Sequence, residues 1–402
     1  MTVFGAGFAH YLSYGATDQQ TVRSLAGTYQ GLLVPGTVAA FQREGTGGFV
    51  LTLSATDDPP DYVIDPRFPL FQQALTTPKR SHESLADACG DPSLVTSTAP
   101  RPEDFTPERI ELIARSWADF NGTYRTAAGG KFEKYARRLG QPLEASNSKN
   151  PAFVLAPYFA ASSVSDPWWA VSKRLYTATA KVVSAPACIR VVAAQHVSAL
   201  SELLQDVSEE RLAIWTSGLE ELKAPVAELI QYAEAIRAGS ERGAKTFALY
   251  GGFFSVLLGN LGLSGSSHGV GYGEYRNWVE LPASGPPPAR YYLPRVHRYV
   301  QPDEALRLYQ ADTRLAACSC EECNGEAPIL LDYHGLMRHS VRCRAREIAE
   351  WSGLDRPTIA SRLDEEATTF LNLLENSGLA DFVVARSRKL AEHLPRWAAA
   401  LR

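Results

Sequence analysis

The 402-residue sequence has few sulfur-containing residues and no marked excess of either charge. It holds 2 Met and 6 Cys, and its 40 basic and 44 acidic residues give a formal net charge of −4. A chain so close to neutral has no overall field that would draw it to nucleic acid or to anionic lipid, so any polyanion site must be a local basic patch. No stretch of about 18 apolar residues is present, so we expect no membrane span.

The sequence also lacks the features of an exported protein. Residues 1–15 contain no basic segment followed by a long apolar one, so we predict no secretory signal. Three of the cysteines, Cys89, Cys188 and Cys343, have no regular spacing, which argues against a disulfide framework. These absences together favour a protein that works in the reducing cytoplasm.

Short apolar segments alternate with helical patterns along most of the chain. Several segments are continuous β-branched or apolar runs, as strands covered on both faces should be. The predicted strands are 31–35, 49–53, 61–65, 153–158, 189–194, 211–215 and 246–250, with an eighth near 262–271. Alternation of strand and helix predicts a parallel sheet, and eight such units favour an α/β fold of the (β/α)8 TIM-barrel type. A doubly wound open sheet is the alternative.

The composition changes along the chain and suggests two parts. Residues 1–310 are predicted to form the barrel, with long loops at about 74–105 and 121–150 that are rich in Pro, Ser, Thr, Gly and charge. Residues 311–402 are predicted to form a zinc-binding and helical C-terminal subdomain, which is rich in arginine beyond about residue 345.

Half of the cysteines lie within six residues, in the sequence CSCEEC. Thiolates of Cys318, Cys320 and Cys323 on one loop, with an imidazole from a following helix, would satisfy the four positions of tetrahedral zinc. His334 lies far enough along the chain to supply that imidazole, and His339 and Cys343 are the other nearby donors. Such a closed shell leaves no position for water, so the Zn²⁺ is expected to be structural.

The motif Cys-x-Cys-x-x-Cys followed by histidine resembles the zinc site of tRNA-guanine transglycosylases. Weaker matches follow in the order of that family at 34–38, 64–72, 193–196 and 216–220, so that the resemblance covers roughly residues 30–345. The resemblance implies a (β/α)8 barrel whose zinc ligands are Cys318, Cys320, Cys323 and His334. The gap between Cys323 and His334 is shorter than the family's, which leaves His339 as an alternative fourth ligand.

The resemblance also implies a reaction and a set of residues for it. The family exchanges guanine in nucleic acid for a 7-deazaguanine base. Asp65, in the stretch IDPRFPLFQ, matches a catalytic aspartate of the family and ends a predicted strand, where barrel active sites lie. Gln195, with His196, falls where the family reads the base, and Gly218 lies in a loop resembling the one that contacts the base. A glutamine amide offers a donor and an acceptor together, as purine reading needs.

The glycine-rich stretch 262–276 departs from the family. The family carries its nucleophilic aspartate near this point, but the stretch contains no aspartate and holds Ser267, His268 and Glu274 instead. Either Glu274 supplies the carboxylate, or Asp65 is the nucleophile, or the chain lacks the exchange activity. A phosphate cradle with no covalent role is the alternative for this loop, and a Ser-His hydrolase is disfavoured because no Gly-x-Ser-x-Gly elbow is present.

Further residues are candidates for substrate contact. Asp166 precedes two tryptophans and could bind the exocyclic nitrogens of a base, although adjacent tryptophans also suit simple packing. Arg338, Arg342 and Arg346 are four residues apart and share one helix face, which predicts contact with phosphates unless the face is merely solvated.

The sequence therefore predicts a zinc-containing base-exchange transglycosylase. Its expected partners are nucleic acid, a 7-deazaguanine base and possible accessory proteins, with no membrane. The DNA-modifying branch of the family is favoured over the tRNA enzymes because the barrel looks trimmed. The target nucleotide would have to be flipped out of the stack to reach the site. A non-catalytic nucleic-acid-binding barrel and a nucleoside N-glycosidase are the alternatives.

Overall fold

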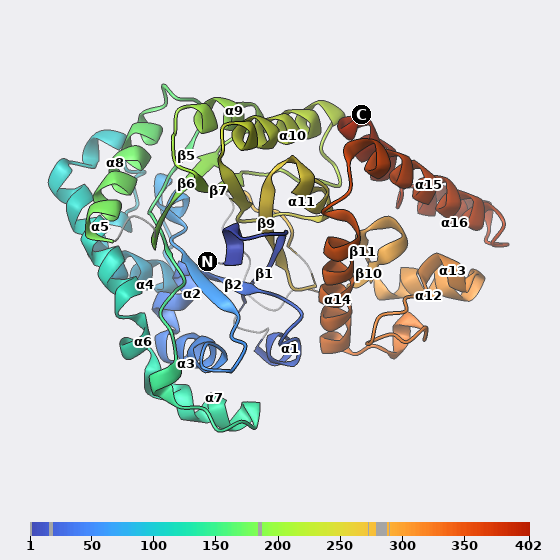
Figure 1. Ribbon diagram of the computed structural model, residues 1–402, viewed down its shortest axis with the longest axis horizontal. Coiled ribbons are helices and arrows are strands. Elements are labelled where there is room, and N and C mark those ends of the chain that lie inside the picture. Colours follow the sequence, from blue (N-terminus) through green and yellow to red (C-terminus); the bar gives the residue numbers. More distant parts are fainter. Residues whose placement is uncertain (1, 16–18, 184–186, 272, 279–287, 289) are drawn as a thin grey trace.

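A computed structural model of the chain describes residues 2–15, 19–183, 187–271, 273–278, 288 and 290–402. Its centre is a curled parallel sheet with helices around the outside (Figure 1). The strands are β1 (Ala9–Ser13), β2 (Gly31–Pro35), β3 (Asp61–Asp65), β4 (Val154–Leu155), β5 (Ala160–Ala161), β6 (Cys188–Ala194), β7 (Arg211–Thr216), β8 (Lys245–Ala248) and β9 (Leu263–Gly269). They follow the order β3-β2-β1-β9-β8-β7-β6-β4, with β5 also paired to β6.

The strand order confirms part of the barrel prediction. All neighbouring strands are parallel, and β9 pairs with β1. A doubly wound sheet grows outward from a switch point and does not bring its last strand back beside its first. The path ends at β3 and β4, and the described residues contain no strand ladder between these two. One backbone hydrogen bond, from Ala152 N to Tyr62 O (2.9 Å), crosses that gap. A complete barrel ladder is therefore not seen.

Alternate residues of the strands point into the curl and form an apolar core. Tyr11, Leu33, Val63 and Phe247 belong to this core, and each is at most 2% exposed. The Tyr11 ring fills the space beside Gly31, where a Cβ would lie 2.3 Å from the ring. A glycine is therefore required at the start of β2 for the curl to close on a tyrosine.

The predicted strands agree with the structure in most places, and one is wrong. β2 and β3 have the predicted bounds, but segment 49–53 is the end of a helix, α3 (Arg43–Leu53). All residues of α3 from Thr46 to Leu53 are buried, so its apolar run shows no helical period. Gly47 lets α3 approach Ala128, which a Cβ would contact at 2.4 Å. The sheet instead begins with β1, which is not among the predicted strands.

Helices cover the outside of the sheet, and the two predicted long loops contain helices of their own. Together with α3, the helices around the sheet and in the two loops are α1 (Gln19–Ser24), α2 (Gly36–Phe41), α4 (Arg80–Ala88), α5 (Pro107–Gly122), α6 (Tyr124–Ala127), α7 (Phe132–Leu139), α8 (Pro167–Val182), α9 (Val197–Gln205), α10 (Val226–Glu241) and α11 (Phe253–Leu257). Among the described residues, no helix is both long enough and apolar enough to cross a membrane.

The C-terminal part is mainly helical and lies to one side of the sheet (Figure 1), where it packs against α1, α10 and α11. It contains the hairpin of β10 (Tyr291–Leu293) and β11 (Arg298–Val300), followed by α12 (Pro302–Ala311), α13 (Thr313–Ala316), α14 (Tyr333–Trp351), α15 (Arg356–Glu375), α16 (Asp381–Arg388) and α17 (His393–Leu401). One hydrophobic cluster includes side chains of α9, α10, α14, α15 and α17, so this part shares a core with the helices around the sheet.

Helix α17 is tied to the loop after β7 by hydrogen bonds to the backbone. The Arg396 guanidinium donates to the carbonyls of Leu222 (2.5 Å), Lys223 (3.0 Å) and Ala224 (3.1 Å). The Trp397 indole N–H is buried and donates to the carbonyl of Glu221 (2.9 Å). Four consecutive carbonyls of this loop therefore find their partners on α17.

Candidate functional site

The cysteine loop and helix α14 form a compact group of soft ligand atoms. Cys318, Cys320 and Cys323 follow α13, and His339 lies on the second turn of α14. All four side chains are buried, and their ligand atoms lie within 4.8 Å of one another. Three thiolates and one imidazole are a donor set that tetrahedral zinc takes, so these residues can hold a metal ion.

The orientation of His339 suits a metal ligand. Its Nε2 lies 2.6 Å from the carbonyl oxygen of Tyr292, so Nε2 carries the proton and donates it there. The Nδ1 lone pair then faces the sulfurs of Cys320 (3.4 Å) and Cys323 (3.1 Å). The ring also stacks on Tyr291, with 4.4 Å between the centroids. A backbone partner on the far nitrogen is the usual way in which a protein orients a ligating histidine.

The prediction that His334 is the fourth ligand is wrong, and the alternative, His339, takes its place. His334 is the second residue of α14, and its Nδ1 lies 2.9 Å from Thr21 Oγ1. Five residues along a helix rotate the side chain by about 140° relative to His339. The helix therefore turns His334 towards α1 and His339 towards the cysteines.

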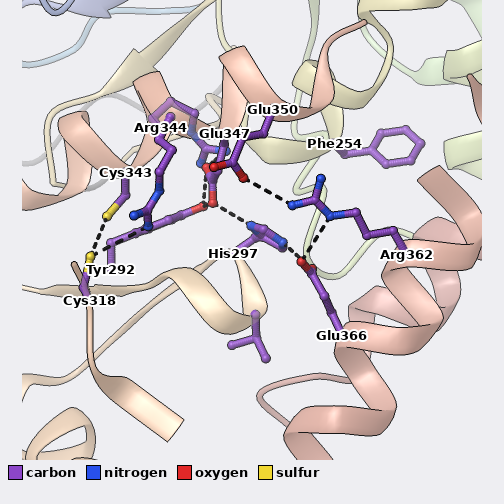
Figure 2. A network of polar contacts seen from close by, with 12 residues as sticks. Phe254, Tyr292, His297, Cys318, Cys343, Arg344, Glu347, Glu350, Arg362 and Glu366 are labelled. Atoms are coloured by element: carbon purple, nitrogen blue, oxygen red, sulfur yellow. Dashed lines mark hydrogen bonds and ion pairs between the residues drawn. The ribbon is translucent and has the colours of Figure 1, made fainter. Parts of the chain in front are cut away.

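Cys343 is a fifth soft donor beside this group. It lies one helical turn after His339, and its Sγ is 3.6 Å from His339 Nδ1. Its Sγ also lies 3.5 Å from Cys318 Sγ (Figure 2). Tetrahedral zinc accepts four ligands, so one of the five donors is left outside the coordination shell. We refer to Cys318, Cys320, Cys323 and His339 as the cysteine cluster, with Cys343 as its neighbour.

The arginines predicted to contact phosphate are engaged with the cysteine loop. Arg338 Nε and Arg342 Nε donate to the two carboxylate oxygens of Glu322, at 2.9 and 3.1 Å. Arg346 donates to Ser319 Oγ at 3.2 Å. The structure therefore gives these arginines the role of bracing the loop against α14, and it does not present the free basic face that was expected.

A buried ionic network joins α14 to the loop after β9. The Arg344 guanidinium pairs with the carboxylates of Glu274 and Glu347, the latter at 3.0 Å. Glu347 also accepts a hydrogen bond from His297 Nδ1 (2.5 Å), whose Nε2 lies 2.7 Å from Glu366 (Figure 2). Glu274 is therefore a structural partner of Arg344, and its predicted place at the reacting centre is not supported.

The carboxylates of this network differ in their affinity for protons. Burial raises the pKa of Glu274 from 4.5 to about 7, and the attraction of Arg344 offsets only part of that. Burial also raises the pKa of Glu221, which lies near Glu274 beside Gly252. Burial opposes ionisation of Glu347 too, but Arg344 and His297 lower its pKa below the usual value. Arg344 is thus shared among several acids and does not neutralise them all.

Ser267 and His268 do not form a catalytic pair. Successive residues of a strand point to opposite faces, and β9 puts Ser267 inside the curl and His268 outside it. Ser267 Oγ lies 2.8 Å from Ser13 Oγ. The His268 nitrogens bond to Ser266 Oγ and to the carbonyl of Gly251, both at 2.9 Å. Burial holds the pKa of His268 well below its usual value, so the ring is a neutral structural group.

Asp65 occupies the carboxyl-terminal edge of the sheet, as predicted, and is fully buried. Its Oδ1 accepts hydrogen bonds from the Tyr158 hydroxyl (2.8 Å) and from the backbone N–H of Arg67 (3.0 Å). Its Oδ2 accepts from the Tyr250 hydroxyl (2.6 Å). Tyr158 lies between β4 and β5, and Tyr250 lies two residues after β8, so three separate segments at this edge of the sheet converge on the carboxylate.

Two arginines and one tryptophan complete the group around Asp65. Arg67 Nε lies 3.6 Å from Asp65 Oδ2, and the Arg276 guanidinium lies over the Tyr250 ring at 5.0 Å. The Trp215 ring lies edge-on to Tyr250, with 5.7 Å between the centroids. We call these residues the Asp65 cluster: Asp65, Arg67, Tyr158, Trp215, Tyr250 and Arg276.

The residues predicted to read a base lie at the same edge of the sheet. The half-buried Gln195 donates its amide to the carbonyl of Ala160 (3.1 Å), and the exposed His196 precedes α9. Gly218 has φ +68° and donates its N–H to the carbonyl of Arg276 (3.0 Å). The Gly218 loop therefore holds the backbone of Arg276, and the Gln195 amide keeps its oxygen for another donor.

Asp166 has a structural role in the described contacts. Its carboxylate caps α8, accepting hydrogen bonds from the N–H groups of Trp168 (3.0 Å) and Ser162 (2.8 Å). Trp168 packs on Phe159 at 4.4 Å between centroids, and Trp169 donates its indole N–H to Asp206. Neither tryptophan is placed for stacking on a base, so the packing alternative is the one observed.

Five of the six members of the Asp65 cluster were not predicted as site residues: Arg67, Tyr158, Trp215, Tyr250 and Arg276. Tyr158 and Tyr250 end two of the predicted strands, 153–158 and 246–250, and Arg67 follows Asp65 by two residues. Polar residues at strand ends were therefore a usable signal for the tyrosines and for Arg67. Arg276 lies seven residues beyond β9, where the sequence gives no indication of its position.

No family model and no curated protein matches this chain. Any assignment of function therefore depends on the ordered motifs of the sequence and on the geometry of the two clusters. Of these, the Asp65 cluster lies where parallel α/β sheets bind their substrates.

Proposed function

We propose that this protein is a base-exchange transglycosylase that replaces guanine in nucleic acid, DNA in preference to tRNA, with a 7-deazaguanine. The observation that carries the proposal is the Asp65 carboxylate, held at the carboxyl-terminal edge of the sheet by the hydroxyls of Tyr158 and Tyr250 from two other segments of the chain. The order of the sequence motifs and the three cysteines of the metal-capable cluster add support. In this proposal the curled sheet works as a (β/α)8 barrel.

The chemistry assigned to Asp65 is attack on the sugar. Its carboxylate oxygen forms a bond to C1′ while the glycosidic bond breaks, and the electron pair leaves with the guanine. The incoming base then bonds to C1′ through a ring nitrogen, gives up the N–H proton of that nitrogen to solvent and displaces the carboxylate, while the departed guanine takes up one proton from solvent. Tyr158 and Tyr250 orient the carboxylate by donating hydrogen bonds to its oxygens. The oxygen that attacks C1′ gives up its tyrosine hydrogen bond and accepts it again when the carboxylate is released. The Gln195 amide oxygen is available to the purine edge, since its N–H group donates to Ala160.

The metal-capable cluster has a supporting role in this proposal. Zinc bound by three thiolates and His339 would supply no chemistry to substrate, because the shell is closed. It would fix the cysteine loop on α14, and Arg344 of α14 holds the loop that carries Glu274 and Arg276. A structural metal thus positions one wall of the Asp65 cluster from outside.

One observation favours a second candidate, a nucleic-acid-binding protein without exchange activity. Asp65 is the only carboxylate in the Asp65 cluster, and Glu274, the other candidate, is held by Arg344. Base exchange commonly needs a general acid or base in addition to a nucleophile. The experiment below separates the two candidates.

The test is incorporation of labelled guanine, and of a labelled 7-deazaguanine, into DNA and into tRNA by the purified protein. We expect incorporation by the wild-type chain and a loss of at least about 100-fold in Asp65→Asn, which removes the nucleophile. Asp61→Asn is the matched control, because Asp61 lies on the same strand and face but at the opposite end. Binding of nucleic acid without incorporation by the wild-type chain would overturn the exchange activity and support the second candidate.

A further inference from the structure

The Asp65 cluster carries more positive than negative charge. It contains two guanidinium groups, those of Arg67 and Arg276, and one carboxylate. The Arg67 side chain is only 14% exposed, and Arg276 is half-buried. Removing a charge from water costs several kcal/mol unless a counter-charge replaces the lost solvation. One of the two cations therefore has no counter-ion within the cluster.

The two guanidinium groups lie in each other's field. Burial lowers the pKa of Arg276, and the nearby charge of Arg67 lowers it further. The Nε atoms of both arginines are buried and make no hydrogen bond in the described part of the chain. Guanidinium groups have only donors, so these atoms need an acceptor. Asp65 does not supply it to Arg67, because its Oδ2 lies 3.6 Å from Arg67 Nε, beyond hydrogen-bonding distance.

The backbone at Arg67 is held in an uncommon conformation that keeps its side chain at this edge. Arg67 has φ +52° and ψ +35°, the left-handed region that non-glycine residues seldom adopt. Such a conformation costs on the order of 1 kcal/mol and is concentrated at functional sites. The N–H of Arg67 is fixed by Asp65, so the same aspartate that would attack the sugar also aims this guanidinium.

We infer that Arg67 and Arg276 form a binding site for one phosphate group, held between the two guanidinium groups next to Asp65. Two planar forks of N–H donors match the tetrahedral oxygens of a phosphate and would use the idle Nε donors. One phosphodiester charge balances the one excess positive charge of the cluster. This inference rests on the proposed function in one respect: the phosphate would belong to the nucleotide whose C1′ lies at Asp65.

The chemistry of the site is that of a phosphate monoanion, which could come from a nucleic-acid strand or from a free nucleotide. Binding is measured with three probes that report without any base exchange: a short single-stranded oligonucleotide, a nucleoside 5′-monophosphate and inorganic phosphate. The variants are Arg67→Gln and Arg276→Gln, with Arg67→Lys as the variant that keeps the charge but loses the fork. Arg211→Gln is the matched control, because Arg211 is exposed at the amino end of β7, the opposite edge of the sheet.

We expect each glutamine variant to weaken oligonucleotide binding at least tenfold and to reduce the slope of log K against log salt by about 0.7, the value for one lost contact on a single strand. Arg67→Lys should keep the slope but not the full affinity, and Arg211→Gln should change neither. Thermal unfolding of each variant shows whether it is folded, and the Arg67→Lys comparison is still informative if Arg67→Gln is not.

The three probes identify the source of the phosphate. Tight binding of the oligonucleotide alone assigns the site to a strand backbone, and binding of the monophosphate or phosphate as well assigns it to a free anion; either outcome supports the site. Wild-type affinity and salt slope in both Arg67→Gln and Arg276→Gln would overturn it. Labelled-base incorporation by those variants at wild-type level, with no binding change, would remove this site and leave the exchange activity standing. If instead the glutamine variants lose oligonucleotide binding and the wild-type chain incorporates no base, the phosphate site stands and the exchange activity is overturned.

Discussion

The cysteine cluster and the Asp65 cluster are built in opposite ways. Three of the four members of the cysteine cluster lie within six consecutive residues, and the fourth follows on the next helix. The Asp65 cluster collects single residues from positions 65 to 276, and the curl of the sheet brings them together. The three cysteines of the first cluster can be found from spacing alone, whereas the second cluster can be recognised only once the strand order is known.

The clusters also differ in the sign of the charge that they lack. Three thiolates and a neutral imidazole need a cation, which a metal supplies. The Asp65 cluster holds two arginines and one aspartate, and it needs an anion. A resident metal ion would complete the first permanently, whereas the second is left for a ligand that comes and goes.

The largest expected effect is loss of the metal. We expect His339→Ala to abolish binding of one zinc per chain and to unfold the C-terminal part. The reason is that structural zinc contributes about 10 kcal/mol or more to folding in small zinc domains. His334→Ala should keep the metal, since His334 pairs with Thr21. Elemental analysis of the purified variants and their thermal unfolding give the answer. A metal-free His334→Ala with a metal-bound His339→Ala would reverse our assignment.

The next largest effect is expected at the ionic network that connects the two clusters. Arg344→Met leaves Glu274 and Glu347 buried without their cation, and breaking such a pair costs about 3–5 kcal/mol of the free energy of unfolding. Arg342→Met removes two partly exposed ion pairs of the same helix, with Glu321 and Glu322, and leaves Glu322 paired with Arg338, so it should cost about 1 kcal/mol or less. Denaturant unfolding measures both. Equal losses for the two variants would mean that burial does not set the strength of this network.

A smaller effect should follow pH. The folded pKa of Glu274, about 7, lies above its ordinary value of 4.5, so the folded chain binds the extra proton between these values. The contribution of Glu274 to stability therefore falls as pH rises from about 4.5 to 7, by at most about 1.4 kcal/mol per pH unit. Glu274→Gln should flatten this part of the curve of unfolding free energy against pH. An unchanged slope in Glu274→Gln would assign the pH dependence to other groups, such as His297.

The smallest effect separates a helix cap from a ligand contact. Asp166→Ala removes the acceptor for the first turn of α8 and should cost about 1 kcal/mol of stability. Affinity for a single-stranded oligonucleotide should not change, because Asp166 is occupied by Trp168 and Ser162. Asp166→Asn, which keeps a capping oxygen, is the control. Wild-type stability combined with weakened binding would restore the base-contacting role.

The strands show how much of the sheet the pattern of apolar residues can predict. Segments 31–35 and 61–65 are apolar, short and bounded by turn residues, and both are strands with the predicted bounds. Segment 49–53 is equally apolar but belongs to a helix, because α3 is buried on all sides and its glycines allow close packing. β1 was missed, since Ala9–Ser13 is short and contains a histidine and a serine. Eight strands were expected and nine are seen in the sheet among the described residues, because β1 replaces the wrong strand 49–53 and β5 adds one more.

The metal ligands show a second limit. Spacing identified the three cysteines, but it could not choose between two histidines five residues apart, because the choice depends on where α14 begins and on which face it presents. One signal was present: His339 and Cys343 are four residues apart and therefore share a helix face. The sequence placed Asp65 at the end of a strand. It did not give the strand order, which brings Tyr158, Tyr250 and Arg276 to Asp65.

The bonds from Arg396 and Trp397 to residues 221–224 have a consequence for synthesis on the ribosome. These partners are separated by more than 170 residues, so the β7 loop is made long before the side chains that satisfy its carbonyls. Until α17 emerges, the nascent chain carries a loop with four idle acceptors, next to an acid destined for burial. Docking of α17 on residues 221–224 is therefore a late, non-local step of folding. A chaperone that shields this loop during translation would protect the segment that waits longest for its partners.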